Sequence, residues 1–108
     1  MHTIRLREPW TVESQSGCVI YRRYFNRPTG LTPDDVVCLV IEQLVDEAKV
    51  SFNSQSLACG GPTSWDITHW LLLRNAVEVS IASEAVPARR AFGEVRLEIS
   101  ERPRSPAA

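Results

Sequence analysis

The sequence predicts an all-β fold, an antiparallel sandwich of about eight short strands, on the strength of three observations. Apolar and polar residues alternate along several segments, most clearly over residues 76–82 and 92–100. Glycine, proline and asparagine separate these segments and mark turns. Apolar residues at helical spacing are almost absent. The 108 residues are enough for one hydrophobic core, so a single domain is expected.

Two strands are predicted near the N-terminus. Residues 2–7 alternate between polar and apolar side chains, and Pro9 breaks the pattern shortly afterwards. Residues 13–17 are small and polar, which predicts a loop. Residues 18–26 are rich in aromatic and β-branched side chains and predict a strand with apolar bulk on both faces. We take its odd-numbered positions as the core face.

Arg23 is the one discordant residue on that face. A buried guanidinium group needs a carboxylate or several carbonyl oxygens as partners. We therefore expect a structural pair with an acid such as Asp66 rather than a role in ligand binding.

The middle of the chain predicts a hairpin preceded by a long strand. Residues 36–44 form the longest predicted strand, and residues 48–52 alternate cleanly. Asn53 and Ser54 tolerate the positive φ of a tight turn, so residues 55–59 should return antiparallel to the preceding strand.

A short helical turn is predicted after the Gly-Gly-Pro break that follows this hairpin. Trp65 and Ile67 share a parity and should point into the core. Thr68 is suited to cap one helical turn over residues 69–72, and Asn75 is suited to end it in a left-handed conformation.

The C-terminal part adds two alternating strands and a tail. We expect the folded domain to span residues 1–100, and residues 101–108, which contain two prolines and lack core-forming side chains, to be disordered. The parities place these residues in one core between two sheets: Phe25, Val50, Phe52, Trp65, Ile67, Val79 and Leu97.

The composition of the chain limits which binding partners and which cellular compartment we expect for it. A formal net charge of −1 gives no electrostatic reason to expect nucleic acid or an anionic membrane as a partner. The N-terminus lacks the apolar segment of a secretory signal, and every apolar run is too short to cross a bilayer. The cysteines are Cys18, Cys38 and Cys59, an odd number without paired metal spacing. They are expected to be reduced, which favours a cytoplasmic protein.

Several segments in order resemble a known family. They are Tyr21-Arg22-Arg23-Tyr24-Phe25 with Pro28, Val36-Val37-Cys38-Leu39-Val40-Ile41, Ala48-Lys49-Val50-Ser51-Phe52-Asn53, Gly61-Pro62, Trp65-Asp66-Ile67-Thr68, and Arg74-Asn75-Ala76-Val77-Glu78-Val79. Together they resemble the galactose-binding-like jelly-roll domain at the N-terminus of glycoside hydrolase family 2 enzymes, over about residues 4 to 99. The sequence departs from that pattern at Ser54, where glycine is usual, and at Trp65, where phenylalanine is usual.

This resemblance implies a jelly-roll sandwich and an association with sugars. The catalytic barrel of those enzymes, which carries their two carboxylates, does not fit in a chain of this length. No catalytic residue is therefore carried over, and we expect the chain not to be an enzyme.

The candidate ligand-binding residues are Trp10, Arg22, Tyr24 and Trp70. Proteins bind sugars by stacking an aromatic ring on the apolar face of a pyranose, with polar side chains beside it for the hydroxyl groups. Trp10 is the first choice for the ring, because the break at Pro9 frees it from strand alternation. Packing into the core is the competing interpretation for Trp10 and Trp70.

Other chemistries find little support in the sequence. The candidates for a hydrolytic pair of carboxylates are Glu42, Asp46, Glu47 and Asp66, but nothing marks two of them as facing one cleft. Cys59 and His69 lack the local signature of a nucleophile and its base, and zinc spacing is missing. Acids such as those at residues 34–35 and 46–47 could ligate calcium in a jelly roll, although ordinary turn acids are the simpler interpretation. No cofactor, metal or catalytic residue is expected.

The sequence thus favours a non-catalytic binding module, with carbohydrate as the first ligand class. The alternative is a structural or protein-interaction domain that keeps the jelly-roll fold without binding sugar. An exposed cluster of the candidate residues would favour sugar, and an uninterrupted apolar patch would favour a protein partner.

Overall fold

The computed structural model describes residues 1–58, 61, 63–85 and 92–101. Within these residues the chain forms nine strands and two short 3-10 helices, so the predicted all-β fold is confirmed. The elements are β1 (His2–Arg5), β2 (Thr11–Gln15), β3 (Cys18–Asn26), β4 (Asp35–Ile41), β5 (Lys49–Phe52), β6 (Gln55–Leu57), β7 (Ser64–Asp66), η1 (Thr68–Trp70), β8 (Arg74–Ala82), η2 (Ser83–Ala85) and β9 (Val95–Glu101). None of the described helices is long and apolar enough to cross a bilayer.

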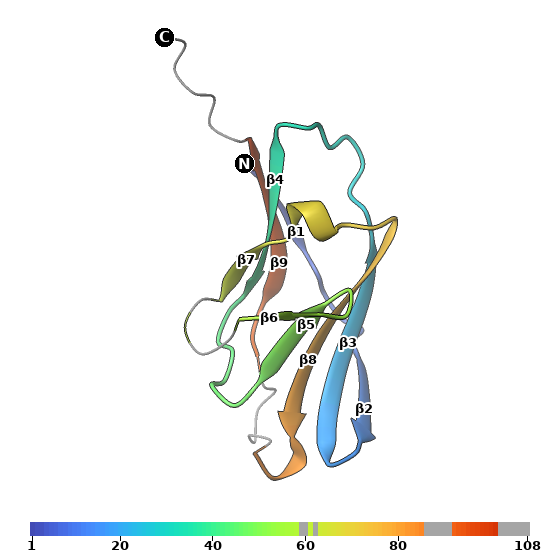
Figure 1. Cartoon of the computed structure of the whole chain (residues 1–108), viewed down its shortest axis with the longest axis vertical. Coiled ribbons are helices and arrows are strands. Elements are labelled where there is room, and N and C mark those ends of the chain that lie inside the picture. Colours follow the sequence, from blue (N-terminus) through green and yellow to red (C-terminus); the bar gives the residue numbers. More distant parts are fainter. Residues whose placement is uncertain (59–60, 62, 86–91, 102–108) are drawn as a thin grey trace.

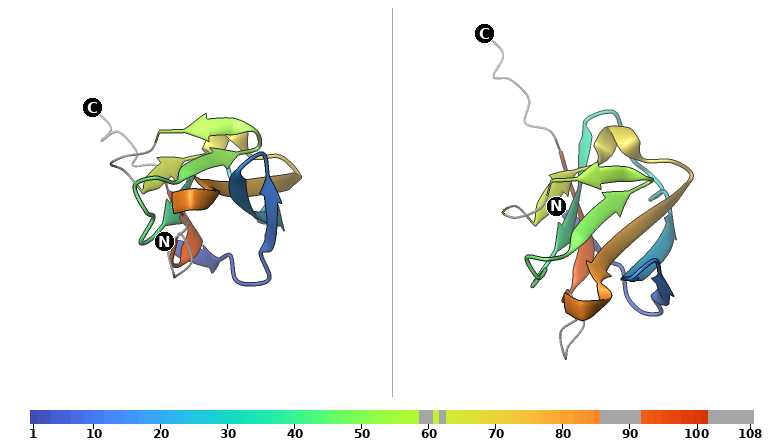
Figure 2. Two further views of the ribbon diagram at one scale, coloured as in Figure 1. Left: turned by 90° about the horizontal axis from the view of Figure 1, so that it is seen from below. Right: turned by 60° about the horizontal axis from the view of Figure 1, so that its bottom comes forward.

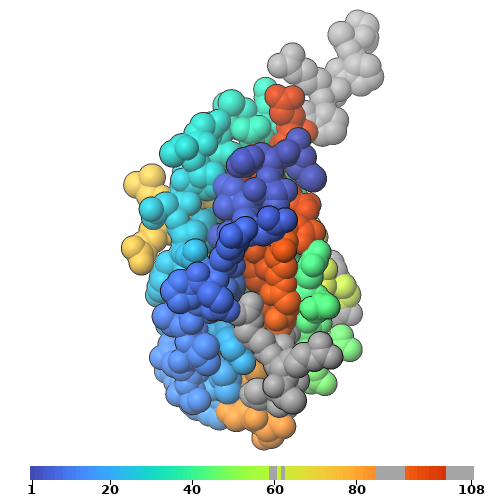
Figure 3. All heavy atoms as spheres, turned by 180° about the vertical axis from the view of Figure 1, so that it is seen from behind, coloured from blue at the N-terminus to red at the C-terminus, as the bar shows by residue number. Residues whose placement is uncertain are grey.

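The strands form two antiparallel sheets that face each other (Figures 1 and 2). One sheet has the order β1-β9-β4-β7, and the other has the order β2-β3-β8-β5-β6. The chain crosses between the sheets at every connection except the β2–β3 and β5–β6 hairpins. Without β2, eight strands remain, four in each sheet, and they follow the jelly-roll arrangement. Figure 3 shows the N-terminal segment lying along β9.

The core confirms the predicted parities. The predicted core residues Val50, Phe52, Ile67, Val79 and Leu97 are buried, and Phe25 and Trp65 pack against them from half-buried positions. Trp65 satisfies its indole N–H by donating to the carbonyl oxygen of Ala58 at 2.7 Å. This contact explains how a large ring with one polar atom fits at the sheet edge.

The sequence predicted the turn of the β5–β6 hairpin correctly but missed the β2–β3 hairpin. Asn53 and Ser54 have φ values of 48° and 67°, so the predicted tight turn is confirmed. The predicted loop over residues 13–17 is wrong, because Thr11–Gln15 forms β2 and pairs with β3. Ser16 and Gly17, both at positive φ, make the turn that joins these two strands.

The predicted helical turn was misplaced. η1 spans Thr68–Trp70, so Thr68 is its first residue, and the residue at the N-cap position is Ile67, which makes no capping hydrogen bond. The hydroxyl oxygen of Thr68 instead accepts from the backbone N–H of Val37 at 2.9 Å, which fastens the turn to β4. Asn75 does not end this turn in a left-handed conformation, because it lies in β8 and its side chain is buried.

Arg23 is half-buried, and its guanidinium group donates hydrogen bonds to carbonyl oxygens rather than pairing with Asp66, the acid that was predicted as its partner. Its Nε donates to the carbonyl oxygen of Arg7 at 2.9 Å, and its Nη1 donates to that of Tyr24. Asp66 instead accepts hydrogen bonds from the backbone and side chain of Thr68. At the C-terminus β9 extends to Glu101, and the predicted disordered residues 102–108 lie outside the described part of the chain.

The two described thiols, Cys18 and Cys38, are free and half-buried. Burial raises the pKa of the Cys38 thiol above its ordinary value of 9.0, and the nearby carboxylates of Asp66 and Glu98 raise it further. The folded chain therefore holds this proton more tightly than the unfolded chain does. Above about pH 9, where the unfolded thiol ionises, this difference should lower the stability of the fold as pH rises.

We expect iodoacetamide to modify Cys38 more slowly in the folded protein than in urea at pH 8.5, because the thiolate is the reactive form. Peptide mapping by mass spectrometry resolves this cysteine from the others, and a Cys18→Ser variant checks the assignment. Equal rates of Cys38 modification in the folded and unfolded protein would contradict this expectation. Cys59 lies outside the described residues.

Candidate functional site

Trp10 is buried, with 7% of its surface exposed, so the prediction of an exposed platform at this residue is wrong. Its backbone N–H donates to the Glu8 carboxylate at 2.8 Å, and its indole N–H donates to the carbonyl oxygen of Leu6 at 3.3 Å. These bonds turn the ring inward, where it packs on Phe92 with ring centroids 4.9 Å apart. Tyr21 contacts Phe92 edge-on at 5.3 Å. Trp10 is therefore a core residue.

Arg22 lies on the outer face of the five-stranded sheet and is held by two acids. Its Nη1 is 2.7 Å from the carboxylate of Glu13 on β2, and its Nε is 3.1 Å from that of Glu78 on β8. The hydrogen bond with Glu78, followed by the one with Glu13, raises the pKa of Arg22. Its charge is thus already balanced within the sheet.

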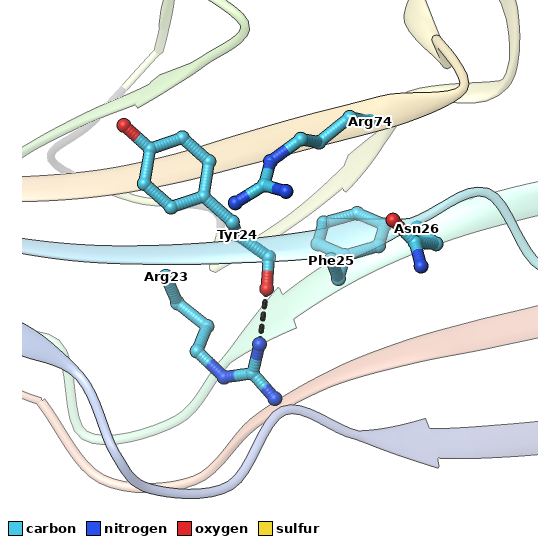
Figure 4. A pocket seen from close by; sticks show the side chains of 5 residues that line it. All are labelled: Arg23, Tyr24, Phe25, Asn26 and Arg74. Atoms are coloured by element: carbon cyan, nitrogen blue, oxygen red, sulfur yellow. Dashed lines mark hydrogen bonds between the residues drawn. The ribbon is translucent and has the colours of Figure 1, made fainter.

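Tyr24 lies on the same outer face and is 43% exposed. The guanidinium carbon of Arg74 lies over its ring, 4.8 Å from the centroid, which is the geometry of a cation–π contact. The two side chains lie beside each other in Figure 4, while Arg23 extends from the other side of the strand. A pocket of about 350 Å³, open to solvent, is lined by Arg23, Tyr24, Phe25, Asn26 and Arg74. We call it the Tyr24 pocket.

The strand pairing explains why a pocket forms here. β2 pairs with β3 only as far as Arg22, which lies opposite Thr11. Among the strands that the structure describes, β8 alone pairs with β3 from Arg23 to Asn26, so this part of β3 has a free edge. On the β8 side, Tyr24 lies opposite Ala76, whose side chain is too small to cover the ring.

Trp70, the last residue of η1, begins an exposed apolar segment that leads into β8. Trp70 and Leu72 are exposed, and Leu73 is 85% exposed. We call these three residues the apolar loop. The carbonyl oxygen of Leu73 accepts from the backbone N–H of Arg27 at 2.9 Å, so the loop lies at the end of the sandwich where β3 ends.

Two asparagines fix the backbone of this loop. Asn75 is 1% exposed, and its side-chain oxygen accepts from the N–H of Leu72 at 2.7 Å and from Nδ2 of Asn53 at 3.0 Å. Its own Nδ2 donates to the carbonyl oxygens of Leu72 at 3.0 Å and Phe25 at 3.4 Å. Asn53 also donates to the carbonyl oxygen of Trp70 at 2.9 Å and accepts from the N–H of Ala76 at 2.8 Å. We call this set of bonds the asparagine network.

Of the four predicted site residues, the structure leaves Tyr24 and Trp70 exposed toward one end of the sandwich. It buries Trp10 and holds Arg22 between two acids. Sequence reasoning missed Arg74, which lies two residues along β8 from Ala76, the partner of Tyr24. The signal that could have found it was the register of β3 against β8.

The acids weighed as catalytic candidates take structural roles where the structure describes their contacts. Glu42 lies 2.7 Å from Arg96, whose guanidinium also contacts Glu98 at 2.9 Å. Hydrogen bonds with Glu98 and then with Glu42 raise the pKa of Arg96. Among the described residues, no three His, Cys, Asp or Glu side chains gather in a group that could hold a metal ion.

No protein-family model matches the chain, and no curated protein matches it. Among solved structures, the chain is similar to a β-glycosidase from Bacteroides vulgatus, with a TM-score of 0.61 and 22% sequence identity. The match covers 80% of this chain but 12% of that chain. The likeness shows that the two proteins share a β-sandwich fold over this segment, and that this fold occurs as a small part of a much longer glycosidase.

Proposed function

We propose that the chain is a non-catalytic carbohydrate-binding module of the galactose-binding-like type, and that it binds sugar at the Tyr24 pocket. The observation that carries this proposal is the exposed Tyr24 ring, which lies among arginine and asparagine side chains in an open pocket. The jelly-roll strand order and the likeness to a short segment of a glycosidase support the choice of module.

The chemistry of the pocket fits a sugar. The guanidinium of Arg74 lies over the Tyr24 ring but leaves the residue 43% exposed, so a pyranose would stack with its apolar C–H groups on the exposed part of the ring beside Arg74. The amide of Asn26 can donate to and accept from hydroxyl groups, and the guanidinium groups can donate to them. A single ring in an open pocket supports only weak binding, on the order of millimolar to micromolar dissociation constants.

A glycan array on the purified protein, followed by an NMR titration with a glycan that binds, tests the proposal. Tyr24→Ala should weaken binding at least about tenfold, because the sugar loses most of its apolar contact. Tyr24→Phe should preserve binding, since the stacking face remains. Trp70→Ala, a second exposed aromatic, is the matched control and should bind as the wild type does. Unchanged binding by Tyr24→Ala would place the sugar elsewhere.

The apolar loop favours a second candidate function, a protein-interaction domain. Trp70, Leu72 and Leu73 are exposed together, and contiguous apolar surface of this kind is typical of protein contacts. The chain's match to a small part of a much longer protein fits such a role. A wild-type protein that binds no glycan on the array would leave this second candidate ahead.

A further inference from the structure

We propose that the Tyr24 pocket selects saccharides that carry a carboxylate, such as uronic acid units, and binds that carboxylate through Arg74. This inference rests on the proposed carbohydrate function and adds the class of sugar. The reasons are the charge balance around the pocket, the unused donors of Arg74, and the position of Arg74 beside the Tyr24 ring.

The charge of the pocket is unbalanced. Elsewhere in the described part of the chain, Arg5, Arg22 and Arg96 each lie within salt-bridge distance of at least one carboxylate. Arg23 and Arg74 have no such partner among the described residues, and no acid lines the pocket. Two guanidinium groups thus line one pocket, from opposite sides of β3, in a protein whose formal net charge is −1. An anionic ligand would balance them.

The unused donors point to the same ligand. A guanidinium group has five N–H donors. Arg23 uses two of them, on the carbonyl oxygens of Arg7 and Tyr24, and these bonds fix its position. The guanidinium of Arg74 is held by its contact with the Tyr24 ring. Arg74 therefore keeps its N–H donors for a ligand, and a planar carboxylate matches the paired donors of a guanidinium better than a hydroxyl group does.

Arg74 lies where its positive charge can reach a sugar bound at Tyr24. Its guanidinium carbon is 4.8 Å from the centroid of the Tyr24 ring, so a pyranose stacked on that ring has its rim within reach of the guanidinium. The carboxylate of a uronic acid projects from the rim of the pyranose, whereas the apolar C–H groups lie on its face. Stacking and ion pairing can therefore be made at once by one sugar unit.

A second pocket of the same molecule has carboxylates in its lining, which the Tyr24 pocket lacks. It has a volume of about 400 Å³ and lies beside β1 and β9, where Asp35 and Glu101 contribute to its lining. Carboxylates at that pocket would repel an anionic sugar. The Tyr24 pocket is thus the better site for an acidic ligand, although the two pockets are of similar size.

Isothermal titration calorimetry with matched oligosaccharides tests the inference on the whole chain. The ligands are an oligogalacturonate, the neutral galactose oligomer of equal length, and a sulfated galactose oligomer, with polyglutamate as an acidic ligand without sugar. We expect the oligogalacturonate to bind about tenfold tighter than the neutral oligomer at low salt, and we expect this preference to shrink as salt rises.

Arg74→Gln should remove the preference while leaving the weak binding of the neutral oligomer. Arg74→Lys keeps the charge but loses the paired donors, so its preference should be intermediate. Arg5→Gln removes one positive charge outside the pocket and is the matched control. The salt dependence of the wild-type protein tests the inference even if an arginine variant does not fold.

Each contrary result has a separate meaning. Equal affinity for the neutral and acidic oligomers would overturn the inference but leave the proposed function standing. If no saccharide bound to the protein, both the inference and the proposed function would be overturned. Tighter binding of the sulfated oligomer would overturn the assignment to a carboxylate. Equal binding of polyglutamate would overturn selection of a sugar and make the pocket a general anion site.

Discussion

Replacing Trp10 with alanine should destabilise the fold by about 3–5 kcal/mol, the usual cost of removing a large buried aromatic side chain. The ring packs on Phe92 and, through it, on Tyr21, so the variant leaves a cavity in the core. It also leaves the Leu6 carbonyl oxygen without its indole donor. In a domain of roughly 100 residues, each kcal/mol lowers Tm by about 4–8 °C. Urea unfolding and thermal melts measure the loss directly.

Trp70→Ala is the control for this experiment, because it truncates the same residue type at an exposed position. Its stability should differ from that of the wild type by no more than about 0.5 kcal/mol. If both tryptophan variants lost stability equally, burial would not explain the effect. A Trp10→Ala protein as stable as the wild type would contradict the core position of this ring.

Asn75→Ala should cost roughly 3 kcal/mol or more, because several buried polar groups lose their partners at once. The substitution removes four hydrogen bonds, two of them to the backbone of Leu72 and one each to Phe25 and Asn53. An aspartate at this position could still accept but could not donate to the two carbonyl oxygens, so Asn75→Asp should also destabilise. Amide hydrogen exchange at Leu72 should become much faster in both variants.

Asn26→Ala is the matched control for the asparagine network. Asn26 is exposed at the end of β3, opposite Arg74, and its truncation should leave stability nearly unchanged. Asn53→Ala breaks the same network from its other side and should cost less than Asn75→Ala, because Asn53 is only half-buried. An Asn75→Ala variant with unchanged stability and unchanged exchange at Leu72 would show that the network contributes little.

Much of the fold could be predicted because it rests on local patterns. Alternation along the chain placed Phe52, Val79 and Leu97 on inward faces, and burial of one face is what such alternation encodes. The Asn53-Ser54 turn could be predicted from the tolerance of these residues for positive φ. Both features depend on residues close together in the sequence.

The errors fall where structure depends on distant partners. All five residues of β2 are exposed, so this edge strand has no buried face and therefore no alternation to detect. Its backbone pairing with β3 holds it in place. Trp10 lies in the core because its ring packs on Phe92, which is far away in the sequence, and nothing in the spacing of nearby residues indicates this contact.

The candidate site, like the fold, could be predicted only where it depends on residues close together in the sequence. Tyr24 could be named because its position in an aromatic strand is local information. Arg74 could not, because its contact with Tyr24 depends on the register of two strands that are far apart in the sequence. For the same reason, the role of Asn75 at the end of the sandwich was missed.

The free edge of β3 has a consequence for the behaviour of the protein at high concentration. An unpaired strand edge offers hydrogen-bonding groups to a second chain and so invites intermolecular strand addition. Here the guanidinium of Arg23 already donates a hydrogen bond to the carbonyl oxygen of Tyr24, which is then less available to another strand. Pro28, which has no backbone N–H to donate, follows shortly after the strand. The charge of the side chain and the missing donor both oppose the approach of another strand. Arg23 should therefore keep the molecules apart in solution, and a variant with an apolar residue at this position should aggregate more readily than the wild type.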